Sequence, residues 1–121
     1  MFLAKVGSTD RADALSFSGT DAGFRLTAET THKTVRAHLL VHGRVHGVGY
    51  RYACAATAGS LGIAGWVRNR PDGAVEAVFE GRDEQVGAAV EWCRHGPSVA
   101  HVTGVDVVDE PPEGLDGFTI R

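Results

Sequence analysis

The sequence has few cysteines, no long run of one charge and no long apolar segment, and each shortage excludes a class of protein. Its two cysteines, Cys54 and Cys93, are too few for a disulfide framework and too far apart for a zinc knuckle. We expect both to be buried free thiols in a reducing cytosol. No stretch is apolar for long enough to span a bilayer, and Lys5 and Gly7 interrupt the first residues before a secretory signal could form. We therefore expect a cytoplasmic protein that does not bind membranes.

The charge balance points away from nucleic acids. The 12 Lys and Arg residues oppose 15 Asp and Glu residues without a basic cluster, for a net charge of -3, so any affinity for an anion has to come from a local site. No His, Cys and carboxylate spacing typical of a metal site is present, and we expect no metal. A chain of 121 residues is long enough for one compact domain and too short for two to be expected.

The first residues differ in composition from the rest. Residues 1–34 are rich in Gly, Ser, Thr and Asp, with scattered apolar residues that follow neither the period of a strand nor that of a helix. We predict a flexible N-terminal extension over residues 1–34, followed by one domain over residues 35–121. A short strand at residues 24–26 is left open as an alternative.

Apolar periodicity in the domain predicts five strands and two helices. Alternating apolar residues predict strands at residues 35–41, 65–69, 74–80 and 102–108, the last with a bulge near Gly104, and a short strand at 117–121. Apolar residues at helical spacing predict helices at residues 50–61 and 82–95, the first stopped by Gly62. The order βαββαβ with a short extra C-terminal strand is typical of the α+β ferredoxin-like sandwich, in which two helices cover one face of a mainly antiparallel sheet.

This topology brings two distant polar residues together. The first and second strands of the fold run parallel with the third strand between them, so both end at the same edge of the sheet. The first strand leads into the loop at residues 43–51 and the second ends at Asn69. We therefore expect Arg51 and Asn69 to face each other.

The loop has the composition of an anion-binding turn. Gly43, Gly47 and Gly49 directly precede a predicted helix, and glycine permits the conformations in which backbone N–H groups converge on an anion at a helix N-terminus. Arg51 lies in the first turn, where acidic residues are favoured, and a bound phosphate would explain it. The alternative is a plain connecting turn with a solvated arginine. A nucleotide P-loop and a dinucleotide fingerprint are both excluded, because their motifs are missing.

Two motifs in this region carry a resemblance to a known family. GRVHGVGYR at residues 43–51 and GIAGWVRN at 62–69, followed by a turn at 72–73 and a C-terminal strand at 118–121, resemble the acylphosphatase patterns G-x-V-Q-G-V-x-F-R and G-x-x-G-x-V-x-N over about residues 36–121. The resemblance implies a hydrolase that splits a small-molecule acyl phosphate into a carboxylate and inorganic phosphate without metal or organic cofactor, and we expect a monomer. It implies catalysis by Arg51 and Asn69, the latter positioning water. It implies phosphate binding by His46, Gly47, Val48, Gly49, Tyr50 and Arg51.

Two residues depart from the family pattern. Tyr50 replaces the usual Phe, and we expect its ring in the core and its hydroxyl at the rim. His46 replaces the usual Gln, and a protonated imidazole would add charge beside the phosphate; alternatively, only its backbone contributes.

Two rival functions stay open. Similar domains occur at the front of larger carbamoyl-transfer maturation proteins, and a non-catalytic ferredoxin-like binding module is the alternative outside enzymes. The motifs do not indicate which acyl group the substrate carries.

Overall fold

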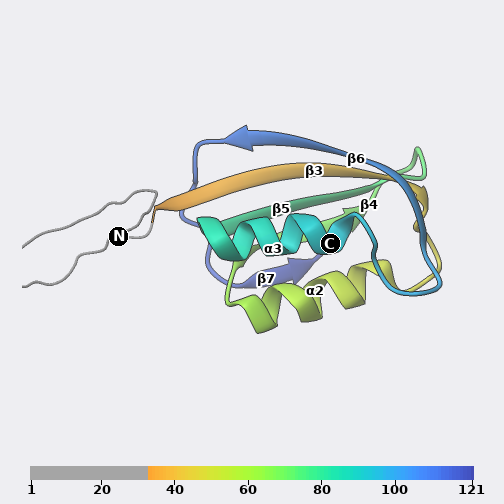
Figure 1. Cartoon of the computed structure of the whole chain (residues 1–121), viewed down its shortest axis with the longest axis horizontal. Helices are drawn as coiled ribbons and strands as arrows, with labels where there is room; N and C mark the ends of the chain where they lie inside the picture. The colour runs from red at the N-terminus through yellow and green to blue at the C-terminus, as the bar shows by residue number, and fades with distance from the viewer. Residues whose placement is uncertain (1–32) are drawn as a thin grey trace, which may run out of the picture. The chain divides into compact units, whose positions relative to one another are not determined.

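The computed structural model describes residues 33–121, which form two helices and five strands (Figure 1). In chain order these are β3 (Thr34–Arg44), α2 (Tyr50–Leu61), β4 (Ala64–Asn69), β5 (Val75–Arg82), α3 (Asp83–Cys93), β6 (His101–Glu110) and β7 (Phe118–Ile120). Apart from its last two residues, the extension predicted over residues 1–34 lies outside the described residues, as does the strand left open at 24–26.

The sheet has the order β6-β3-β5-β4-β7. Strands β3 and β4 both pair antiparallel with β5, so they run parallel to each other with β5 between them. The short strand β7 runs parallel to β4 at the outer edge. The predicted ferredoxin-like α+β fold with a short extra C-terminal strand is therefore confirmed.

One face of the sheet carries the apolar core. Alternate residues of β3 and β5 point to this face because side chains along a strand alternate between its two sides. Helices α2 and α3 both cover it (Figure 1), each with a stripe of residues spaced three or four apart. The core residues are Ala37, Leu39 and Val41 of β3, Val75, Ala77 and Phe79 of β5, Tyr50, Cys54 and Ala58 of α2, and Val86, Ala89 and Cys93 of α3.

The cysteines of the two helices are neighbours within this core. Cys54 and Cys93 are both free and buried. Hydrogen bonding to Cys93 and burial raise the pKa of the Cys54 thiol, which keeps it protonated and unreactive at neutral pH. That both remain free thiols in the cell stays a prediction.

Strand pairing at the β3–β6 edge extends further than the apolar pattern predicted. Strand β3 continues to Arg44, so Gly43 belongs to the strand and not to the loop that was predicted to contain it. The register shifts there: His42 pairs with Gly104 and Gly43 pairs with Val102. One residue of β6, Thr103, is therefore unpaired, and the bulge predicted near Gly104 is confirmed.

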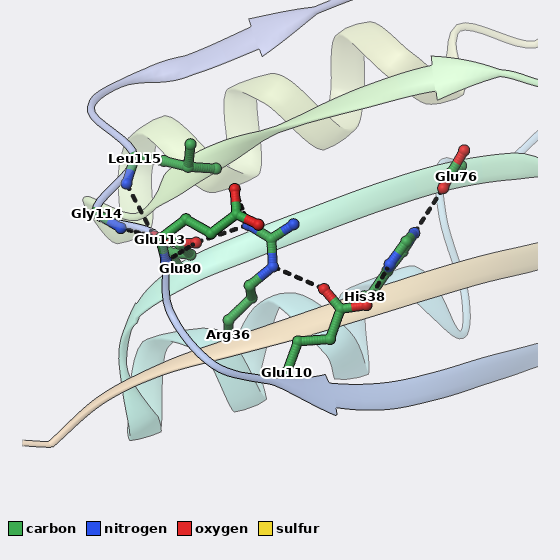
Figure 2. Close-up of polar contacts among 8 residues, drawn as sticks. All are labelled: Arg36, His38, Glu76, Glu80, Glu110, Glu113, Gly114 and Leu115. Atoms are coloured by element: carbon green, nitrogen blue, oxygen red, sulfur yellow. Dashed lines mark hydrogen bonds and ion pairs between the residues drawn. The ribbon is translucent and has the colours of Figure 1, made fainter.

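The other face of the sheet carries a network of charged side chains (Figure 2). Arg36 Nη1 lies 2.7 Å from Glu80 Oε2, and Arg36 Nε lies 2.8 Å from Glu110 Oε1. His38 bridges two carboxylates, with Nδ1 2.8 Å from Glu110 Oε2 and Nε2 2.5 Å from Glu76 Oε2. These contacts join β3, β5 and β6 across the sheet.

Glu80 also fixes the segment that leads from β6 to β7. It accepts hydrogen bonds from the N–H groups of residues 113, 114 and 115 at 2.9 to 3.0 Å (Figure 2). Burial opposes ionisation, but these N–H groups and Arg36 outweigh it and lower the pKa of Glu80. The resulting carboxylate directs the chain toward the far edge of the sheet, where β7 pairs with β4.

Within residues 33–121, neither helix is long and apolar enough to cross a membrane.

Candidate active site

The site lies at the edge of the sheet where β3 and β4 end. Val75, the first residue of β5, pairs with Val41 on one side and with Asn69 on the other. Neighbouring strands are about 4.8 Å apart, so Asn69 lies roughly 10 Å from the strand that leads into the glycine-rich loop. Parallel strands with one strand between them therefore bring the two motifs to one place, as the sequence predicted.

A cavity of about 220 Å³ lies between the loop and the end of β4. Arg51 and Asn69 both line it. Of the other predicted site residues, Gly47, Gly49 and Tyr50 line it, whereas His46 and Val48 do not. Its lining consists of Val45, Gly47, Gly49, Tyr50, Arg51, Tyr52 and Asn69.

The loop delivers unpaired backbone N–H groups to this cavity. Gly47 and Gly49 have φ angles of 70° and 76°, which residues with a side chain rarely adopt. Gly49 is the N-cap of α2, no side chain caps this helix, and no acidic residue lies in its first turn. The N–H of Ala53 makes the bond to the Gly49 carbonyl at 3.0 Å, so the N–H groups of residues 50–52 have no helical partner. Such a helix N-terminus attracts anions.

Arg51 extends from the first turn of α2 toward β7. Its Nη1 donates to the carbonyl of Arg121 across a long contact of 3.4 Å, so most of its donors remain available to a ligand. Arg121 is itself held in place, because its N–H donates to the Val67 carbonyl at 2.8 Å and its guanidinium lies 4.5 Å from the centre of the Trp66 ring. The C-terminal strand thus supports the position of the Arg51 guanidinium.

Asn69 presents an unsatisfied acceptor. Its Oδ1 is buried and has no hydrogen-bond partner within residues 33–121. A buried polar atom without a partner destabilises a fold by about 1–3 kcal/mol, so a ligand or water that pairs with it would remove this penalty. The only other buried side-chain atom of this kind in the described residues is Oε1 of Gln85, which lies at the start of α3 and does not line the cavity.

The turn that follows Asn69 is held by local hydrogen bonds. Arg70 N–H donates to the Ala74 carbonyl at 2.8 Å, and Ala74 N–H donates to Asp72 Oδ1 at 3.0 Å. A hydrogen bond from Arg70 and the Ala74 N–H lower the pKa of Asp72 to about 2. Asp72 is therefore ionised at neutral pH, and the turn stays closed next to Asn69.

His46 links the glycine-rich loop to this turn. Its Nε2 lies 2.9 Å from the Ala74 carbonyl, an acceptor, so this nitrogen carries the proton and donates. The side chain therefore contacts the hairpin that carries Asn69. It connects the two halves of the site from outside the cavity.

The Tyr50 hydroxyl lies in the core, so the prediction that it lies at the rim is wrong. Tyr50 is 1% exposed, and its hydroxyl donates to the Cys93 carbonyl at 2.8 Å. The end of α3 supplies this acceptor, and burial raises the pKa of the phenol. Tyr50 therefore lines the cavity while its hydroxyl is committed to the core.

Tyr52, which is not among the predicted site residues, also lines the cavity. Its side chain is 72% exposed, in contrast to Tyr50. Its place directly after Arg51, in the first turn of the helix, was the available signal: the two tyrosines are two residues apart and so point to different sides of the helix.

These features define a ferredoxin-like α+β domain with a cavity at one edge of its sheet that is lined by an arginine and the N-terminus of a helix. The family model of acylphosphatases matches residues 37–120. The acylphosphatase of Thermococcus kodakarensis is 54% identical over 88 residues, which cover 73% of this chain and 97% of that protein. The chain therefore belongs to the acylphosphatase family, and the predicted enzyme class is confirmed.

Solved structures agree with this assignment. The crystal structure of acylphosphatase from Bacillus subtilis superposes with a TM-score of 0.70 at 36% identity, over 72% of this chain and 98% of that chain. The crystal structure of T. kodakarensis HypF also matches, at 33% identity and a TM-score of 0.62, over 71% of this chain but 11% of that chain. A domain of this fold thus also occurs within a much longer protein.

Proposed function

We propose that this protein hydrolyses acyl phosphates to a carboxylate and inorganic phosphate, with the phosphoryl group bound by the loop and Arg51 and the attacking water positioned by Asn69. The observation that carries the proposal is the buried, unpaired Oδ1 of Asn69 at the cavity that Arg51 also lines. One residue supplies positive charge and the other a neutral acceptor. The first stabilises the charge of the phosphoryl group and the second can position water, which are the two contributions that catalyse phosphoryl transfer to water.

The phosphoryl group is bound by backbone and guanidinium donors. The unpaired N–H groups at the start of α2 and the backbone of residues 46–51 surround its oxygens, and the Arg51 fork contacts two of them. These donors remain positioned while charge moves onto the phosphoryl oxygens during the reaction. Their stabilisation of that charge needs no rearrangement at the moment of bond breaking.

Asn69 positions the nucleophile. Its Oδ1 accepts a hydrogen bond from a water molecule and holds it in line with the bond that breaks. The water oxygen forms a bond to phosphorus while the bond from phosphorus to the acyl oxygen breaks, and the electron pair of that bond leaves with the carboxylate. Among the described residues no carboxylate or imidazole lines the cavity, so the proton of the water passes to a phosphoryl oxygen.

The leaving group explains why so few side chains suffice. A carboxylate leaves without protonation, so the reaction requires no general acid. Within residues 33–121, no group of three or more His, Cys, Asp or Glu side chains is arranged to hold a metal ion. The charge needed for phosphate binding comes from Arg51 and the backbone.

Replacing Arg51 and Asn69 separately tests the proposal. Arg51→Ala should weaken competitive inhibition by inorganic phosphate as well as turnover, because the guanidinium binds phosphate before and during the reaction. Asn69→Ala should leave phosphate inhibition nearly unchanged and lower kcat on the order of a hundredfold, the scale of losing one positioned polar group at a reacting centre. Steady-state kinetics with acetyl phosphate measure both effects.

Matched controls exist on α3 and at its C-cap. Gln85→Ala removes the other buried, unpaired amide oxygen, and Arg94→Ala removes an exposed guanidinium that pairs with Glu91. Neither residue lines the cavity, and both variants should retain wild-type kinetics. Turnover by Asn69→Ala at the wild-type rate would contradict the water-positioning role.

A further inference from the structure

Tyr52 occupies an unusual position for an aromatic residue. It lies in the first turn of α2, directly after Arg51, and its side chain is 72% exposed. Within residues 33–121 the side chain has no hydrogen bond and no ring contact. Tyrosine has an intermediate helix propensity, and acidic residues are preferred in the first turn of a helix. Local structure therefore gives no reason for an aromatic residue here.

The position of Tyr52 in the cavity supplies a reason. The lining contains two aromatic residues, of which Tyr50 is 1% exposed and Tyr52 is 72% exposed. The ring of Tyr50 is therefore committed to the core. Tyr52 alone offers an exposed aromatic face to a ligand at the mouth of the cavity.

The acyl group of a bound substrate has to lie near this ring. The backbone donors and Arg51 hold the phosphoryl group inside the cavity, and the water held by Asn69 occupies one side of the phosphorus atom. The leaving acyl oxygen must then point away from that water, because attacking and leaving oxygens are in line. Of the exposed residues that line the cavity, Gly47, Gly49 and Tyr52, only Tyr52 has a side chain that the emerging part of the substrate can contact.

We propose that Tyr52 is a specificity-determining residue that favours acyl phosphates with an aromatic acyl group. The proposal rests on the proposed function, because it places the acyl group relative to a phosphoryl group held by Arg51. An offset-stacked or edge-to-face pair of rings contributes about 0.5–1.5 kcal/mol beyond simple burial. This corresponds to a preference of roughly two- to twelvefold for a substrate with a ring. The methyl group of a small aliphatic acyl phosphate covers too little of the Tyr52 ring to benefit in the same way.

The test compares benzoyl phosphate with acetyl phosphate. For the full chain we expect Tyr52→Ala to lower kcat/KM for benzoyl phosphate about three- to tenfold and to leave kcat/KM for acetyl phosphate within about twofold, on the basis of the same ring–ring energy. Tyr52→Phe, which keeps the ring, should retain the wild-type values for both substrates. Val108→Ala removes another exposed apolar side chain, on β6 and away from the cavity, and should change neither value.

Inhibition by inorganic phosphate separates a loss of ring contact from damage to the loop. It should be equal in wild type and Tyr52→Ala, because phosphate has no acyl group. An equal loss for both substrates, a loss of phosphate inhibition, or no change in benzoyl phosphate hydrolysis would overturn the role of Tyr52 while leaving the proposed function intact. If the wild-type protein hydrolysed neither substrate, the proposed function would fail, and this inference with it.

Discussion

Within residues 33–121, two amide side chains have a buried oxygen without a partner, and their surroundings differ. Gln85 lies at the start of α3, whereas Asn69 lines a cavity together with Arg51 and the start of α2. An unpaired acceptor alone is a cost to stability. Next to an anion-binding site, such an acceptor can hold a water molecule that attacks the anion. This is the basis of the role proposed for Asn69.

His46 connects the two halves of the site, and its replacement should reveal this. His46→Gln keeps an N–H donor that can reach the Ala74 carbonyl, and kcat should stay within about threefold of wild type. His46→Ala removes a hydrogen bond worth about 0.5–1.5 kcal/mol and loosens the loop from the hairpin that carries Asn69, so kcat should fall by roughly two- to tenfold. Steady-state kinetics of both variants measure the difference.

The pH dependence of substrate binding distinguishes this role from direct contact with phosphate. If the imidazole touched the phosphate, substrate binding would strengthen as the ring gained a proton, and His46→Gln would abolish that trend. With the ring held against the hairpin, wild type and His46→Gln should have the same profile of KM against pH. Equal losses of kcat in the Gln and Ala variants would contradict the linking role.

The position of a single residue could be predicted where the two motifs and the strand topology agreed. It could not be predicted where it depends on a contact with a residue far away in the sequence. The placement of Arg51 and Asn69 at one cavity followed from parallel strands that end at one edge. The destination of the Tyr50 hydroxyl depends on a carbonyl at the end of α3, 43 residues further along the chain. No local pattern contains such a contact.

At the scale of helices and strands, apolar periodicity predicted the elements well and their ends less well. Strand β3 pairs through Arg44 although its alternating apolar pattern stops at Val41, because β6 supplies backbone partners beyond the core. Helix α3 ends at Cys93, two residues before the predicted boundary. The charged network on the open face was not predicted at all, since Arg36 and Glu110 are 74 residues apart in the sequence.

This network makes stability depend on the protonation of His38. Burial opposes its charge, but hydrogen bonds to Glu110 and Glu76 outweigh burial and raise the pKa of His38, whereas the pKa values of both carboxyls are lowered. Because the pKa of His38 is higher in the folded than in the unfolded protein, its contacts with Glu76 and Glu110 stabilise the fold fully at pH values below the unfolded pKa of about 6.5. This contribution is lost as pH rises through the pKa of His38 in the folded protein.

Urea unfolding of wild type and His38→Gln measures this contribution. The difference in unfolding free energy between them should be larger at about pH 5.5 than at about pH 9, by on the order of 1 kcal/mol, the net value of a typical hydrogen bond. His95→Gln is the matched control, because His95 also pairs with a glutamate but its side chain is 74% exposed, and surface pairs contribute little. A difference for His38→Gln that did not change with pH would contradict the charged bridge.

At the scale of the whole molecule, residues 33–121 contain the whole segment that the family model matches and every residue assigned to the site. The family model matches residues 37–120, and the T. kodakarensis acylphosphatase aligns over 97% of its own length with 73% of this chain. The activity proposed here should therefore not require the preceding residues.

Removal of residues 1–32 tests this directly. The truncated protein keeps β3 from its first residue, Thr34, and should have a kcat within a few-fold of the full chain and nearly the same melting temperature. Circular dichroism establishes folding and steady-state kinetics establish activity. A truncated protein that folded but had lost activity would assign part of the site to the first 32 residues.

The most direct test of the central claim is to measure phosphate release from benzoyl phosphate by the full chain. Phenyl phosphate serves as the matched phosphomonoester, and each assay is run with and without a chelator. The two substrates share a ring and a phosphoryl group but differ in the leaving group, and only the carboxylate leaves without an acid. We expect rapid release from benzoyl phosphate, release from phenyl phosphate lower by several orders of magnitude, and no effect of the chelator. Comparable rates for the two substrates, or loss of activity on chelation, would contradict a site in which Arg51, Asn69 and the backbone suffice.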